Sequence, residues 1–171
     1  MKHSFFTLLL LATVFSFNVL AQDQEDKSKR PSPPAKAEGV IDGKKIKIDY
    51  SAPSAKGRKM LGGKEPFGEV WRTGANETTT IEFDKPVKIE GKDLPAGKYA
   101  LFTIPGEKEW VIIFNKTIKW GAYSYKQSED VLRVTVKPTK TDKFVETFNI
   151  SVGKDEVLLK WENTAVAFKV K

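Results

Sequence analysis

The sequence predicts an all-β protein, an antiparallel β-sandwich of the jelly-roll or immunoglobulin-like kind. Short runs alternate apolar and polar side chains, and turn signals separate these runs at intervals of roughly 8–12 residues. No run has the 3.6-residue periodicity of an amphipathic helix. A closed β-barrel is the alternative, because the same pattern suits a sheet that curls on itself.

The first hairpin is predicted at Asp42-Gly43. Both central residues of a type I′ turn need a positive φ, and Asp-Gly is a favoured pair for such turns. The run that follows, residues 45–50, alternates strictly between polar and apolar side chains. Ile46, Ile48 and Tyr50 are therefore expected to face the core.

The centre of the core is predicted to be a second hairpin. Residues 98–104 and 110–114 are apolar at nearly every position, which is typical of strands that are covered on both faces. Pro105-Gly106 begins the turn between them. Further strands are expected at residues 79–83, 86–89, 132–136, 144–152, 157–161 and 166–170, with turns at 138–143, 153–155 and 163–164.

The N-terminal region predicts export. Residues 1–21 have a short basic start, an apolar run and a small residue before a cleavage point between Ala21 and Gln22, which is the pattern of a signal peptide. The apolar run is too short for a membrane span, so the mature protein is expected in the periplasm or outside the cell. Residues 22–36 are polar and Pro-rich and predict a flexible tether, with a docking arm as the alternative. Residues 37–171 are then one β-sandwich domain.

The composition excludes several functions. The chain has no cysteine, and its only histidine is His3 in the predicted signal peptide. Catalysis by Ser-His-Asp or Cys-His groups and zinc binding by His or Cys are therefore excluded from the mature protein. No cofactor or metal site is expected. The formal net charge is +7, but the lysines are dispersed, so a nucleic-acid partner is not expected.

The stretch of residues 71–77 is the first candidate site. Arg72 and Asn76 offer paired hydrogen bonds, and the Trp71 indole offers a surface on which a sugar ring can stack. Two interpretations remain open for these residues. They form a ligand site, or they tie the long irregular loop of residues 51–68 to the sheet.

A second candidate is the loop that carries Trp120, Tyr123 and Tyr125. Aromatic side chains on a loop stack on a ligand or anchor the loop by packing, and the sequence leaves both alternatives open. The predicted ligand-binding residues are Arg58, Trp71, Arg72, Asn76, Glu77, Trp120, Tyr123 and Tyr125.

Several of these segments together resemble a known family. They are the runs at residues 30–33, 51–53, 56–58, 94–99, 114–115 and 120–123 and, above all, Trp71-Arg72-Thr73-Gly74-Ala75-Asn76. This combination is similar to a family of exported bacterial proteins catalogued only as a domain of unknown function. The resemblance covers roughly residues 30–171 and implies a secreted single domain, with no activity, cofactor or catalytic residue to carry over.

The function that the residues favour is non-catalytic binding of a carbohydrate or of an anionic component of the cell envelope. No catalytic residue is assigned. The alternatives are a small glycosidase-like hydrolase that uses paired carboxylates, with Glu65 and Glu77 among the available groups, or a purely structural envelope protein.

Overall fold

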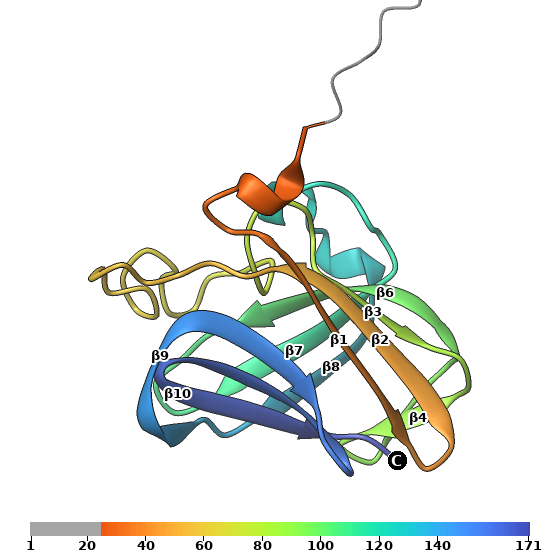
Figure 1. Ribbon diagram of the computed structural model, residues 1–171. Coiled ribbons are helices and arrows are strands. Elements are labelled where there is room, and N and C mark those ends of the chain that lie inside the picture. Colours follow the sequence, from red (N-terminus) through yellow and green to blue (C-terminus); the bar gives the residue numbers. More distant parts are fainter. Residues whose placement is uncertain (1–24) are drawn as a thin grey trace, which may run out of the picture.

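The computed structural model describes residues 25–171, which form ten strands and three short 3-10 helices (Figure 1). The predicted signal peptide, with its cleavage point between Ala21 and Gln22, lies outside the described residues. The short helices are η1 (Lys27–Lys29), η2 (Ala122–Ser124) and η3 (Gln127–Glu129).

The larger sheet has six antiparallel strands in the order β1-β2-β3-β6-β7-β8. These strands are β1 (Pro34–Ile41), β2 (Lys44–Ser51), β3 (Thr80–Phe83), β6 (Gly97–Ile104), β7 (Trp110–Asn115) and β8 (Asp130–Val136). Two hairpins complete the fold: β4 (Val87–Ile89) with β5 (Lys92–Leu94), and β9 (Thr139–Val152) with β10 (Glu156–Lys169).

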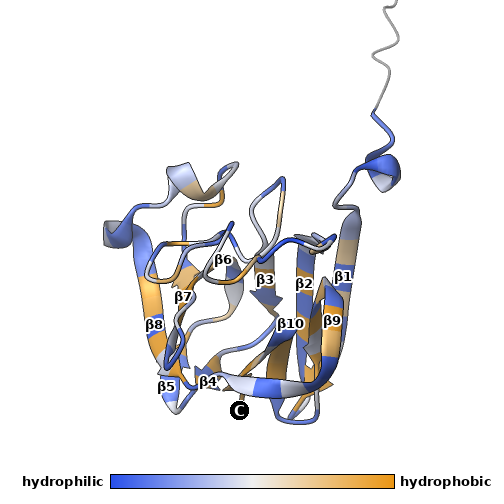
Figure 2. Cartoon of the chain, turned by 90° about the vertical axis from the view of Figure 1, so that its left-hand side faces the viewer, coloured by the Kyte–Doolittle hydropathy of each residue, from blue (hydrophilic) through white to orange (hydrophobic). Residues whose placement is uncertain are grey.

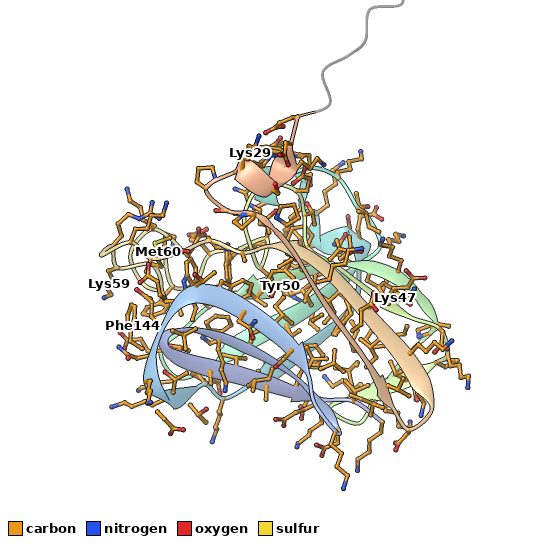
Figure 3. All side chains as sticks on the ribbon, in the orientation of Figure 1. Lys29, Lys47, Tyr50, Lys59, Met60 and Phe144 are labelled. Carbon is orange, nitrogen blue, oxygen red and sulfur yellow. The ribbon has the colours of Figure 1, made fainter. Side chains whose placement is uncertain are left out.

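The long β9–β10 hairpin packs across the face of the larger sheet, and the core lies between them (Figure 1). Phe114 of β7 meets Phe168 of β10 edge-on, with 5.7 Å between ring centroids, and Tyr50 of β2 meets Phe148 of β9 at 5.8 Å. Figure 3 shows Tyr50 in this interior, whereas Lys47 and Phe144 lie at the outside. The predicted antiparallel β-sandwich is confirmed. In the described chain β1 and β8 remain the two edges of the sheet, so the alternative of a closed barrel is not realised.

The first predicted hairpin is confirmed. β1 and β2 pair around Asp42 and Gly43, whose φ values are 49° and 70°, as a turn with two left-handed residues requires. Ile46, Ile48 and Tyr50 are buried as expected, and Lys47 and Asp49, which alternate with them, are exposed.

The central hairpin is also confirmed, because β6 and β7 pair directly. One face of these strands contributes to the main core. On the other face Phe102 and Ile113 form a small second apolar cluster, over which Val70 and Tyr125 pack. The long connections of the chain therefore cover the outer face of the sheet as well. Figure 2 shows these connections gathered at the end of the sandwich away from the C-terminus.

The C-terminal hairpin differs from the prediction. β9 begins at Thr139, where a turn was expected, and β10 runs without interruption through the turn expected at residues 163–164. A β-bulge replaces that turn, and Glu162 within it has a φ of 50°. The bulge moves the large buried side chains from odd-numbered positions, ending at Trp161, to even-numbered positions, beginning at Val166.

Residues 25–36, the described part of the segment predicted as a tether, contain regular structure. Strand β1 already begins at Pro34, and η1 lies within the remainder. Arg30 pairs with Glu77, its Nη1 lying 2.9 Å from the carboxylate. The described part of this segment is therefore attached to the domain through β-pairing and an ion pair.

Candidate functional site

Trp71 belongs to the core of the sandwich. Its backbone pairs with Thr103 of β6 through hydrogen bonds of 2.7 and 2.9 Å. Its ring stacks on Trp161 at 5.5 Å and meets Phe148 at 5.0 Å, while its Nε1 donates to the Gly74 carbonyl. Only 3% of the residue is exposed, so the indole has almost no surface to offer a ligand. Its position favours the interpretation in which this stretch ties the loop to the sheet.

A tight turn follows Trp71 and returns the chain toward β3. Thr73 and Asn76 have left-handed φ values of 56° and 55°. Gly74 lies so close to its neighbours that a Cβ there would be 2.9 Å from the Ser51 carbonyl oxygen and from Thr79 Oγ1. Only glycine fits this position without displacing the backbone.

Arg72 and Asn76 both bind backbone carbonyls. Arg72 Nη1 donates to the Asn76 carbonyl at 2.8 Å, and Asn76 Nδ2 donates to the Ser32 carbonyl at 2.9 Å. Asn76 therefore joins the turn to the N-terminal segment. Arg72 is half-buried, and its guanidinium also lies over the ring of Trp120, with Cζ 5.7 Å from the centroid.

Glu77 is occupied by the N-terminal segment. Its carboxylate accepts from Lys27 Nζ at 2.9 Å and from Arg30 Nη1 at 2.9 and 3.0 Å. Hydrogen bonds from Lys27, from its own backbone N–H and from Arg30 lower the pKa of Glu77 to about 2. Through these contacts Glu77 attaches residues 27–30 to the turn that follows Trp71.

Trp120, Tyr123 and Arg72 form what we call the exposed aromatic cluster. Trp120 is 55% exposed and Tyr123 is 78% exposed, and their ring centroids are 5.8 Å apart. The loop that carries the rings is joined to the turn because Thr78 Oγ1 donates to the Lys119 carbonyl. Two exposed aromatic rings and the half-buried Arg72 thus lie together at one place.

Tyr125 and Arg58 lie outside this cluster. The Tyr125 ring packs on Phe102 at 5.2 Å and its hydroxyl donates to Asp130 Oδ2, so it anchors the loop, and burial raises its pKa to about 12. Arg58 donates to the carbonyls of Ser54 and Ala55 within its own loop. It lines a separate hollow, which it shares with Lys56 and Ser32.

Glu65 and Glu77 have different electrostatic environments. Burial raises the pKa of Glu65, and the nearby Arg72 cation opposes this rise. Glu77 instead interacts with Lys27 and Arg30, and neither glutamate perturbs the pKa of the other. This arrangement gives no support to a Glu65–Glu77 pair of catalytic carboxylates.

Glu162 has a role that the sequence did not reveal. Its carboxylate accepts from the backbone N–H groups of Met60 and Leu61, both at 2.8 Å, and so holds the tip of the long loop. The bulge in β10 directs this side chain to the loop. The change in parity between Trp161 and Val166 was the one sequence signal of that bulge.

Residues 25–171 contain no cluster of three or more His, Cys, Asp or Glu side chains that could hold a metal ion. This part of the chain also contains no helix of the length and apolar character needed to cross a membrane.

The fold and the cluster define an antiparallel β-sandwich protein with two exposed aromatic rings beside an arginine on its long connections. The chain belongs to a family described as "Protein of unknown function (DUF2911)", whose model matches residues 32–170. The predicted membership in a family of unknown function is thereby confirmed. No curated protein and no solved structure matches the chain.

Proposed function

We propose that this protein is an exported, non-catalytic binding protein that holds a carbohydrate of the cell envelope at the exposed aromatic cluster. The observation that carries the proposal is the exposure of Trp120 and Tyr123 as neighbouring rings beside Arg72. Large aromatic side chains at solvent-exposed positions are enriched where proteins bind partners. The export signal at residues 1–21 supports an envelope ligand.

The chemistry of the cluster fits a sugar. The apolar C–H face of a pyranose ring can pack on an indole or phenol ring, while its hydroxyls or a carboxylate accept hydrogen bonds from a guanidinium. Arg72 has five N–H donors, and the Asn76 carbonyl accepts from its Nη1. The remaining donors give the cluster a preference for a sugar that carries an anionic group.

A glycan panel with neutral and uronic-acid-containing oligosaccharides tests this proposal. Trp120→Ala and Tyr123→Ala should each weaken binding by about tenfold, the cost of truncating a contact aromatic. Arg72→Lys keeps the charge but removes the planar fork, so it should weaken binding of the anionic oligosaccharides more than binding of the neutral ones.

Phe144→Ala is the matched control, because Phe144 is 52% exposed but lies on β9 and not on the connection that carries Trp120 and Tyr123. It should leave binding unchanged. If no glycan binds, or if binding persists in both Trp120→Ala and Tyr123→Ala with the fold intact by circular dichroism, the proposal is wrong.

A further inference from the structure

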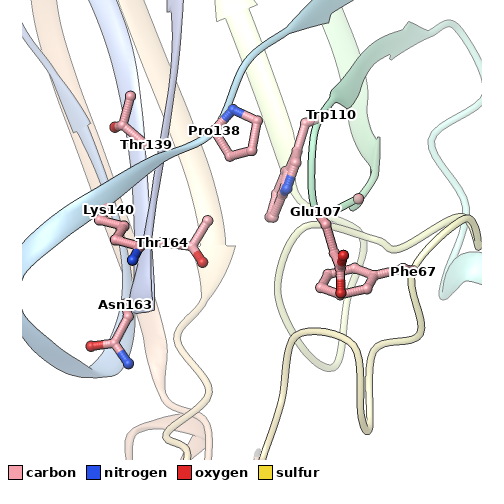
Figure 4. Close-up of a pocket in the computed structure, with 9 residues that line it drawn as sticks. Phe67, Glu107, Trp110, Pro138, Thr139, Lys140, Asn163 and Thr164 are labelled. Atoms are coloured by element: carbon pink, nitrogen blue, oxygen red, sulfur yellow. The ribbon is translucent and has the colours of Figure 1, made fainter.

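A pocket of about 380 Å³ lies where the β6–β7 turn, the end of the long loop and the β9–β10 hairpin meet (Figure 4). Its size suits a small molecule. The side chains that define it are Phe67, Glu107, Trp110, Lys140, Asn163 and Thr164. None of them belongs to the exposed aromatic cluster, so this pocket is a separate site.

One wall of the pocket is fixed by glycine. Gly62 has a φ of 71°, and a Cβ there would lie 2.5 Å from Cε2 of Phe67, so the loop backbone lies against the ring. The adjacent Gly68 N–H donates to the Pro105 carbonyl at 2.9 Å. These contacts hold the Phe67 ring beside the β6–β7 turn.

The opposite wall is formed by the irregular part of the C-terminal hairpin. Between the pairs Thr164↔Lys140 and Glu162↔Val145, β9 advances five residues while β10 advances two. Bulges of this kind redirect side chains and are over-represented beside functional sites. Here the side chains of Lys140 and Thr164 line the pocket (Figure 4).

The indole of Trp110 lies between the two walls (Figure 4). The residue is 2% exposed and its ring meets Trp71 edge-on at 6.4 Å. Within residues 25–171 its Nε1–H is buried and has no hydrogen-bond acceptor. An unsatisfied buried donor is costly. A small rotation of the indole toward the pocket would give this donor an acceptor on a bound molecule.

The two walls carry opposite charges. Figure 4 shows the Glu107 carboxylate beside Phe67 and Lys140 on the facing hairpin. In the described part of the chain, neither side chain is in an ion pair. Both side chains are exposed, and a ligand with a charge at each end would complement them.

We propose that this pocket binds a small zwitterion with an apolar side chain, such as a hydrophobic amino acid or dipeptide. The ammonium group of the ligand pairs with Glu107 and its carboxylate pairs with Lys140. The apolar side chain packs on Phe67. The carbonyl or carboxylate oxygen nearest the floor accepts from Trp110 Nε1. This site does not depend on carbohydrate binding at the exposed aromatic cluster.

The test uses the full mature protein and the dipeptide Leu-Phe in four forms: free, N-acetylated, C-amidated and capped at both ends. Calorimetry measures affinity, and the indole N–H NMR resonance of Trp110 reports occupancy of the pocket. Capping either end should weaken binding by about fivefold, the scale of one partly exposed ion pair. The Trp110 resonance should move on addition of the free dipeptide.

The variants separate the two contacts. Glu107→Gln should bind the free and N-acetylated forms equally, and Lys140→Met should bind the free and C-amidated forms equally, because each variant has lost the partner of the capped group. Glu109→Gln and Lys137→Met are matched controls: both residues are exposed, lie close in sequence and do not line the pocket. Both should keep the wild-type preference for free ends.

Three outcomes would overturn the proposal. The first is no binding of any form up to on the order of 10 mM. The second is equal binding of the free and doubly capped dipeptides. The third is displacement of the dipeptide by a neutral disaccharide whose affinity is unchanged in Glu107→Gln and Lys140→Met, which would identify a sugar site instead.

Discussion

Trp71 and Trp120 both lie in long connections outside the named strands, yet one is 3% exposed and the other 55%. The left-handed turn after Trp71 returns the chain to the sheet, where Thr73 Oγ1 donates to Thr103 Oγ1 at 3.2 Å. After Trp120, Gly121 with a φ of 79° leads into η2, which carries Tyr123 into solvent. The path of the backbone beyond a loop tryptophan, and the partners within reach of the ring, decide whether the indole supports the fold or faces solvent.

The largest expected effect is on Trp71. Trp71→Ala removes a ring that contacts Trp161, Phe148 and Trp110, so we expect a loss of about 3–5 kcal/mol in the free energy of unfolding. Urea denaturation measures this. A loss below about 1 kcal/mol would show that the core closes without the indole and would contradict its structural role.

The turn after Trp71 should be the next most sensitive position. Gly74→Ala places a Cβ against the Ser51 carbonyl and Thr79 Oγ1, so we expect a loss of about 1–3 kcal/mol. Gly57→Ala is the matched control. Gly57 also has a positive φ, 72°, but a Cβ added there would have no neighbour within 4 Å. Thermal unfolding measures both variants. The loss in Gly57→Ala reports the cost of a positive φ, and any additional loss in Gly74→Ala reports the steric contact. Equal losses would show that the close approach at Gly74 has no effect on stability.

The ion pairs of Glu77 predict a smaller, pH-dependent effect. The pKa of this carboxyl is lowered from 4.5 to about 2, so its contribution is complete above pH 4.5 and is lost as the pH falls toward 2. Wild type should therefore be more stable than Glu77→Gln at neutral pH, and the charge-dependent part of the difference should vanish as the pH falls through 2. Denaturation curves across this range measure it. A difference that stayed constant with pH would show that the charge of Glu77 is not responsible.

The smallest effect on stability is expected for Trp120. Trp120→Ala should change the free energy of unfolding by no more than about 0.5 kcal/mol, as is usual for an exposed side chain. The same urea denaturation measures the change. A loss comparable to that of Trp71→Ala would mean that the Trp120 ring anchors its loop, and the contrast between the two tryptophans would disappear.

The strands were predictable where one local pattern determined them. Alternation placed Ile46 and Ile48 inside, and the double-sided apolar runs around Phe102 and Phe114 identified the central hairpin. The bulge at Glu162 was not predicted, because Asn163-Thr164 is also a turn signal. Only the pairing with β9 shows that the strand continues through these residues.

The candidate site was predictable in part. The sequence selected loop aromatics as candidate ligand-binding residues, but it could not separate Trp71 from Trp120, because the partners that bury Trp71 come from β9 and β10. The pocket around Trp110 was not predictable either. Phe67, Lys140 and Asn163 are distant in the sequence, and only the packing of the two sheets brings them to one place.

The attachment of Glu162 to the long loop has a consequence for folding. The carboxylate lies 102 and 101 residues along the chain from Met60 and Leu61, whose N–H groups it accepts. Contacts between such distant residues require closure of a long chain segment and are formed slowly. The loop around Met60 and Leu61 is therefore fixed only after β10 has docked. During folding it should be among the last segments to become resistant to proteolysis.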